Sequence, residues 1–243
     1  MSERGLIRYA PWQFRDFVVD RGIAIMIIGV LWGYLLIAPV RASMGPAFAA
    51  NPLSPTWSIL MTVISSVVSL AVLIALNGMV STDRKMGYYR FIFAKPLSPV
   101  AFYAQLFVVY MVGVLIAMLL LSLMLKHFVA SFSVFNFVLY SALIYIAMGG
   151  IGFFISVATR LDWLTLAAVW LGSHMLRSLY GAKPGFVGKL VQLLPPVHKL
   201  DSVANGIITY RSAPASDITW LLAYGLLFFV LGLLLLKRGQ LAD

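Results

Sequence analysis

Long apolar runs separated by shorter polar stretches form the main pattern along this chain. A helix needs roughly 20 mostly apolar residues to cross a bilayer, because it rises about 1.5 Å per residue through a hydrocarbon core about 30 Å thick. Six runs approach or exceed that length, and they cover residues 22–40, 58–80, 101–125, 134–158, 164–180 and 218–236. The pattern predicts an all-α, polytopic membrane protein with six transmembrane helices.

The fifth run, 164–180, is the shortest of the six and holds His174 and Arg177. Charged and polar side chains inside a membrane are costly unless they face protein or water. We therefore expect this helix to be tilted, broken or packed inside the bundle.

Residues 1–21, ahead of the first run, are predicted to form an amphipathic helix at the cytoplasmic membrane interface. Pro11 suits a first helical turn, and the apolar and polar side chains that follow it fall on opposite faces. The apolar face holds Phe14, Phe17 and Val18, and the polar face holds Gln13, Asp16 and Asp20. The stretch contains no small-residue cleavage site, so we expect the first span to be an uncleaved anchor.

Between the fifth and sixth runs lies a region rich in glycine and proline, residues 181–217. Apolar residues recur there at helical spacing, which predicts short amphipathic helices. Pro195, Pro196 and Gly206 are expected to interrupt them.

Composition favours a single membrane domain over residues 1–243. Of these residues 62% are hydrophobic and 11% are charged, whereas a soluble domain has about 25% charged residues. The net charge of +10 fits basic residues that flank membrane spans, so we expect a lipid bilayer and no nucleic acid as partner. The absence of cysteine excludes disulfides and thiolate metal sites.

The basic residues also bear on orientation. With six spans and both termini in the cytoplasm, eleven of the 18 basic residues are cytoplasmic and the other seven are external. This bias is shallow, because five of the seven lie between the first residue of run 164–180 and the last run. If run 164–180 did not cross, those charges would be internal and the rule would favour that topology. We expect six crossings, because the run is too apolar for a cytoplasmic loop.

The sequence lacks the phosphate-binding motif GxxxxGK[ST], the zinc motif HExxH and the serine nucleophile motif GxSxG. His198 and Asp201 stand three residues apart, as do His174 and Arg177, and each pair can share a helical face. Neither pair has a third ligand or a nucleophile nearby, so we expect polar contacts, with no catalytic residue, metal or cofactor in this chain. The confident spans contain no Asp or Glu, which disfavours an ion-driven transporter.

Segment 77–105, NGMVSTDRKMGYYRFIFAKPLSPVAFYAQ, resembles the connection between the second and third helices of type-2 ABC exporter permeases. That family shows an acidic-basic pair, a glycine about three residues later, and a basic-Pro-apolar-Ser run that opens the third span. Here these positions are Asp83 with Arg84, Gly87, and Lys95, Pro96, Leu97 and Ser98. The chain departs from the family at Tyr88, where a small hydroxyl residue is usual, and at Gln105, where lysine is frequent.

A second stretch, PPVHKLDSVANGIITY, is similar to the external segment that precedes the sixth helix of the same family. His198, Asp201 and Gly206 carry this match. The resemblance implies that residues 181–217 form short external re-entrant helices between helices five and six.

The resemblance implies a permease subunit of an ATP-driven ABC transporter, expected to be an exporter, and no enzyme by itself. A separate ABC ATPase subunit, in two copies that carry ATP and Mg, would dock on a cytoplasmic coupling loop, residues 81–100. The substrate path would form in a dimer with a second permease chain, identical or different. The expected location is a bacterial inner membrane, with both termini cytoplasmic.

The expected docking surface combines polar residues with aromatic residues that anchor interfaces. Its residues in the coupling loop are Asp83, Arg84, Lys85, Gly87, Tyr88, Tyr89, Arg90 and Phe91, and its residues in the interfacial helix are Gln13, Arg15 and Asp16. A basic loop that merely enforces topology is the simpler interpretation. The aromatic residues are more numerous than topology requires, which favours a docking role.

Two other functions stay open at this point. One is a stand-alone membrane enzyme or assembly factor that uses His174, Arg177, His198 and Asp201. The other is an ABC-type membrane unit in which ATP hydrolysis drives a mechanical or signalling task without transport. The apolar residues of the spans indicate no particular substrate.

Overall fold

The computed structural model describes residues 7–44, 55–85, 98–128, 133–159, 163–181, 184–192, 194, 198–208 and 213–239. This part of the chain is 90% helical and contains no strand, which confirms the predicted all-α class. Five helices in it are long and apolar enough to cross a membrane. They are Ala10–Leu35, Ile64–Asp83, Pro99–Lys126, Val134–Ala158 and Ala215–Arg238.

The first spanning helix is longer than expected. Helix α2 (Ala10–Phe17) continues through a π-helical turn, η1 (Val18–Gly22), into α3 (Ile23–Met44) without a break. The separate interfacial helix expected over residues 1–21 is thus the beginning of a continuous rod, as far as it lies in the described residues. The reason is tertiary packing: Phe17 is 1% exposed and its ring lies 5.2 Å from that of Tyr110, so protein covers Phe17, whereas Val18 of the same predicted face is exposed.

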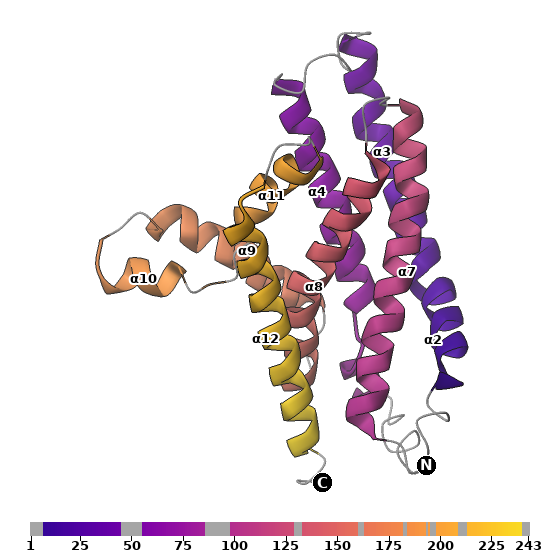
Figure 1. Ribbon diagram of the computed structural model, residues 1–243, viewed down its shortest axis with the longest axis vertical. Helices are drawn as coiled ribbons and strands as arrows, with labels where there is room; N and C mark the ends of the chain where they lie inside the picture. The colour runs from indigo at the N-terminus through magenta and orange to yellow at the C-terminus, as the bar shows by residue number, and fades with distance from the viewer. Residues whose placement is uncertain are drawn as a thin grey trace.

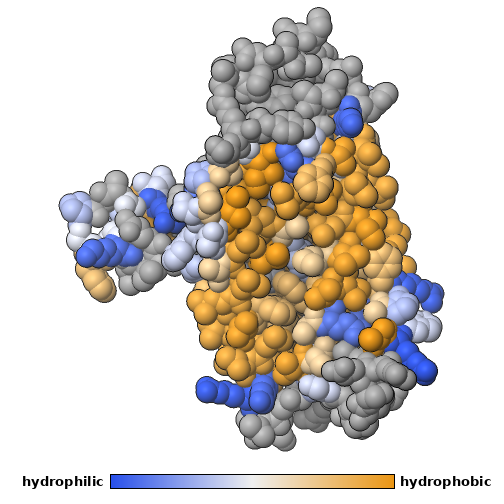
Figure 2. All heavy atoms as spheres, in the orientation of Figure 1, coloured by the Kyte–Doolittle hydropathy of each residue, from blue (hydrophilic) through white to orange (hydrophobic). Residues whose placement is uncertain are grey.

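The other long helices run beside it in a bundle (Figure 1). They are α4 (Pro55–Leu76), α7 (Pro99–Phe128), α8 (Val134–Ala158) and α12 (Ala215–Gly239). Helix α7 follows the direction of the first helix, and α4, α8 and α12 run the opposite way. Helix α2 begins and α12 ends at the same end of the molecule, where the N and C labels lie in Figure 1. In Figure 2 an apolar belt covers the middle of the visible face, with charged residues at its lower edge, as expected for a multi-pass membrane protein.

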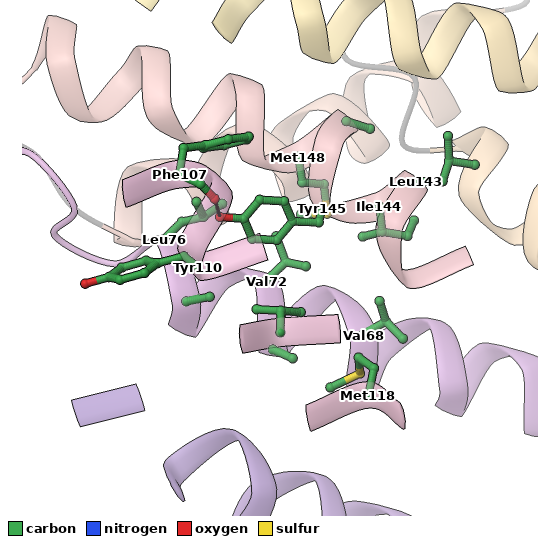
Figure 3. Packing of buried hydrophobic residues seen from close by; sticks show 14 of the residues in the cluster. Val68, Val72, Leu76, Phe107, Tyr110, Met118, Leu143, Ile144, Tyr145 and Met148 are labelled. Carbon is green, nitrogen blue, oxygen red and sulfur yellow. Dashed lines mark hydrogen bonds between the residues drawn. The ribbon is translucent and has the colours of Figure 1, made fainter. Parts of the chain in front are cut away.

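Helix α8 lies at the centre of the bundle, and fifteen of its residues are buried. Figure 3 shows apolar side chains from α4, α7 and α8 converging on one another, with Val72 and Phe107 beside Tyr145. Glycines allow the closest helix contact: an added Cβ on Gly150 would meet the backbone of Gly225 in α12. This agrees with the close approach that small residues permit between membrane helices.

The fifth predicted span forms a helix that leaves the bundle. Helix α9 (Trp163–Tyr180) projects sideways together with α10 (Phe186–Gln192), instead of running alongside the other long helices (Figure 1). Among the described residues, the candidate spans number five, and a sixth crossing stays a prediction. The reduced apolar character that made 164–180 the weakest run in the sequence agrees with this placement.

Helix α11 (His198–Ile208) lies in the upper half of Figure 1, away from both termini, and packs on α4 and α8. Its residues Leu200, Val203 and Ala204 are buried, so residues 181–217 do contain short helices. Gly206 does not interrupt α11 as predicted. It lies inside the helix, where an added Cβ would sit 2.6 Å from the Cα of Ala213.

Candidate functional site

Polar contacts between helices gather at the end of the bundle that holds the termini, where the coupling loop begins. Helix α4 ends at Leu76, and a turn leads to the short helix α5 (Ser81–Lys85). Gly78 has a φ of +68°, a left-handed conformation that glycine adopts without strain. The regular α4 helix is therefore interrupted by a turn at Gly78 before the chain enters the coupling loop.

Ser156, in the last turn of α8, holds this turn in place. Its Oγ accepts hydrogen bonds from the backbone N–H of Val80, at 3.1 Å, and of Ser81, at 3.3 Å. Ser156 is 5% exposed. The first N–H groups of a helix have no partner within that helix. The Ser156 hydroxyl therefore pairs two backbone N–H groups at the start of α5 that burial would otherwise leave without a partner.

Asp83 joins the start of the coupling loop to α7. The Tyr103 hydroxyl donates a hydrogen bond of 2.9 Å to the Asp83 carboxylate. Tyr103 is fully buried and lies one turn after the start of α7. The two ends of the coupling loop are therefore connected at its base.

Arg21, in η1, joins the first helix to α4 and α7. Its guanidinium donates to the carbonyl oxygen of Ala75, one of the last α4 carbonyls that lack a helical partner. The same guanidinium lies over the Tyr110 ring, 4.7 Å from its centroid, in cation–π geometry. A charge at this depth is thus compensated by a carbonyl dipole and an aromatic face.

Gln13 lies nearby in α2 and faces the interior. It is 6% exposed, and its Oε1 accepts a 3.0 Å hydrogen bond from Gln105 Nε2. Arg15 and Asp16, the other two predicted residues of this segment, are exposed, and Arg15 lies over the Trp12 ring. Arg15 and Asp16 are therefore accessible to a partner protein, whereas Gln13 holds α2 against α7.

The remaining predicted residues of the coupling loop are described only in part. Arg84 and Lys85 belong to α5, whose backbone is described there without their side chains. Gly87, Tyr88, Tyr89, Arg90 and Phe91 lie outside the described residues. Their proposed role in docking stays a prediction.

A second group of polar contacts fixes α11 at the far end. The hydroxyls of Ser65 and Tyr140 lie 2.7 Å apart, and Asn136 Nδ2 donates a 2.8 Å hydrogen bond to the Ile207 carbonyl. Lys199 forms an ion pair with Asp217. The predicted residues His198 and Asp201 lie on α11, with their side chains outside the described part, and Gly206 is buried.

No cluster of three or more His, Asp or Glu residues able to hold a metal occurs in the described part of the chain. His174 and Arg177 lie on α9, which packs on α10, α4 and α8, whereas His198 and Asp201 lie on α11. The contacts at the coupling loop join backbone segments of four helices, an arrangement suited to mechanical linkage.

Sequence reasoning singled out Asp83 but missed Arg21, Tyr103 and Ser156. Each had a weak signal, because a polar or charged side chain within or beside an apolar run must find a partner. The periodicity of apolar residues in the sequence does not reveal which residue that partner is.

The fold defines a helical, multi-pass membrane protein. Comparisons with protein-family models, with curated proteins and with solved structures found no match.

Proposed function

We propose that this chain is the transmembrane permease subunit of an ATP-driven ABC exporter. The observation that carries the proposal is the coupling loop: its sequence resembles that of type-2 ABC exporter permeases, and its first residues are tied to α7 and α8. Buried donors at the base of any loop need partners, and here those partners lie on two spanning helices, so a force on the loop would reach both.

Charge supports a cytoplasmic location for this end of the bundle. Arg8, Arg15 and Arg21 lie near the start of the first helix, and Lys237 and Arg238 end α12 at the same end in Figure 1. Basic residues concentrate on the cytoplasmic side of membrane proteins. Both termini and the coupling loop would then face the compartment that contains ATP.

The energy source would be a separate ATPase. The chain has no phosphate-binding loop, so ATP and Mg would be held by two copies of a partner subunit. Arg15 and Asp16 are exposed at the same end of the bundle as the coupling loop and would add polar contacts to the docking surface.

The transport route would lie between two permease chains. A pocket between α3, α4, α7 and α8, lined by Gly29, Gly33 and apolar side chains, has room for about one water molecule. Such a pocket is too small for a transported molecule. A second copy of the chain, or a related one, would complete the path.

Co-purification tests this proposal. The tagged chain, co-expressed with the genes that flank its own, is expected to retain an ABC ATPase and its ATP hydrolysis after purification in mild detergent. The double variant Arg84→Glu, Tyr88→Ala is expected to lose the ATPase. Lys237→Glu is the matched control, because it reverses an exposed charge at the same end outside the coupling loop. Retention of the ATPase by the double variant would refute this docking surface.

A further inference from the structure

We infer that Ser156, Tyr103 and Arg21 are positioning residues that transmit movement of the coupling loop to the spanning helices. The inference rests on the proposed function and goes beyond it, because it states how docking at one end would move the bundle. Arg21 and Ser156 lie outside the stretches that resemble ABC permeases, and Tyr103 lies in segment 77–105 but is not one of its matched positions.

The contact of Ser156 is with the backbone of the coupling loop. Its hydroxyl accepts from two successive amides, so any displacement of Val80 and Ser81 is passed to α8 whatever their side chains do. Helix α8 is the central helix and has its closest contact with α12, through Gly150 and Gly225. Movement of the end of α8 would therefore be passed along α8 and on to α12.

Tyr103 closes the coupling loop at its base. Asp83 lies at the beginning of the loop, and Tyr103 follows the loop in α7, twenty residues later. The hydrogen bond between them ties α5 to α7. A partner that displaces α5 would therefore shift α7 with it.

Arg21 adds the first helix to the linkage. It connects η1 to the end of α4 through the Ala75 carbonyl, and to α7 through the Tyr110 ring. The π-helical turn in which Arg21 lies is a local departure from α-helical geometry, of a kind that often occurs at functional positions. The three residues together join the start of the coupling loop to four spanning helices.

The chain offers a close control for Ser156. Ser141 is also a buried serine of α8, but its Oγ donates at 2.8 Å to the Phe137 carbonyl of the same helix. Ser156→Ala removes a contact between helices, whereas Ser141→Ala removes one within a helix. Tyr103→Phe is a second, independent variant, which deletes one oxygen and keeps the buried ring.

The experiment uses a cysteine as reporter at the opposite end of the bundle. The sequence contains no cysteine, so Ser216→Cys, at the exposed start of α12, introduces a unique thiol. The permease–ATPase complex is reconstituted in lipid nanodiscs, and the rate of maleimide labelling is measured with and without ATP and orthovanadate. Hydrogen exchange of the Val80 and Ser81 amides is measured in the same samples.

In the otherwise unchanged chain and in Ser141→Ala, ATP with orthovanadate is expected to change the labelling rate. In Ser156→Ala and Tyr103→Phe this change is expected to fall at least fivefold, while ATP hydrolysis persists. Ser156→Ala is also expected to speed exchange of the two amides by about fivefold, the effect of one lost hydrogen bond.

Two results would overturn the inference and leave the proposed function intact. One is a labelling change of normal size in both Ser156→Ala and Tyr103→Phe. The other is an equal loss in Ser141→Ala, which would show a general effect on α8. A chain that retains no ATPase at all would refute the proposed function, and the inference with it.

Discussion

Replacing Gly150 with alanine is expected to force α8 and α12 apart. A Cβ at this position would meet the carbonyl oxygen of Gly225 and would lie 2.6 Å from its carbonyl carbon. Two carbon atoms in contact are normally about 3.5 Å apart, so the backbones must separate by at least about 0.9 Å, and by more because the carbonyl oxygen would be closer still. The obstructing atoms belong to the backbone of α12, so no change of rotamer can relieve the overlap.

The cost follows from two opposing effects. Overpacking of a tight interior costs about 3 kcal/mol at the upper end of its range, which applies here because the backbone is rigid. Alanine favours a helix over glycine by about 1 kcal/mol, which offsets part of this. The expected net loss is about 2 kcal/mol. For a chain of this size it corresponds to a fall in Tm of roughly 4–8 °C.

The assay is thermal unfolding of the purified protein in detergent, followed by circular dichroism. Gly172→Ala is the control, because Gly172 lies in α9 and an added Cβ there has no atom within 4 Å. The control gains helix propensity without a clash and is expected to match or slightly exceed the Tm of the parent chain. If Gly150→Ala were as stable as Gly172→Ala, the close contact of α8 with α12 would be refuted.

Three further predictions follow from other contacts. Phe17→Ala is expected to cost about 3 kcal/mol in the same unfolding assay, because it leaves a cavity beside α7, and an unchanged Tm would argue against the buried α2. Tyr140→Phe is expected to cost about 1 kcal/mol through its lost contact with Ser65, and a larger Tm in the variant would contradict that contact. Thr82→Cys and Ser216→Cys are expected to react with a membrane-impermeant maleimide from opposite sides of the membrane. Labelling of both from one side would disprove the placement of α5 and α12 at opposite ends.

The spanning helices could be predicted because the bilayer imposes a local rule. Every backbone N–H and C=O in the hydrocarbon region needs a partner, and a helix of apolar residues supplies those partners within one segment. Runs 134–158 and 218–236 therefore appear in the structure as α8 and α12 with nearly the predicted bounds. Each of these two helices could be predicted from its own run of residues, without information about the rest of the chain.

The candidate site could be predicted only where sequence neighbours form it. Asp83 stood out because the coupling loop is charged and aromatic over a continuous stretch. Ser156 was an ordinary serine in an apolar run, and 75 residues separate it from the amide of Ser81 that it binds. Contacts at such separation depend on which helix faces which, and periodicity carries no information about that choice.

The sequence by itself determined the class of the protein, because hydrophobic length and composition act locally and the bilayer enforces them. Tertiary structure decided that residues ahead of the first run extend its helix, since Phe17 finds a site beside Gly113 in α7. It also decided that α9 leaves the bundle, because a short run that contains Arg177 packs less favourably among apolar helices. The linkage of the coupling loop by Ser156, Tyr103 and Arg21 likewise exists only once four helices have met at one end of the bundle.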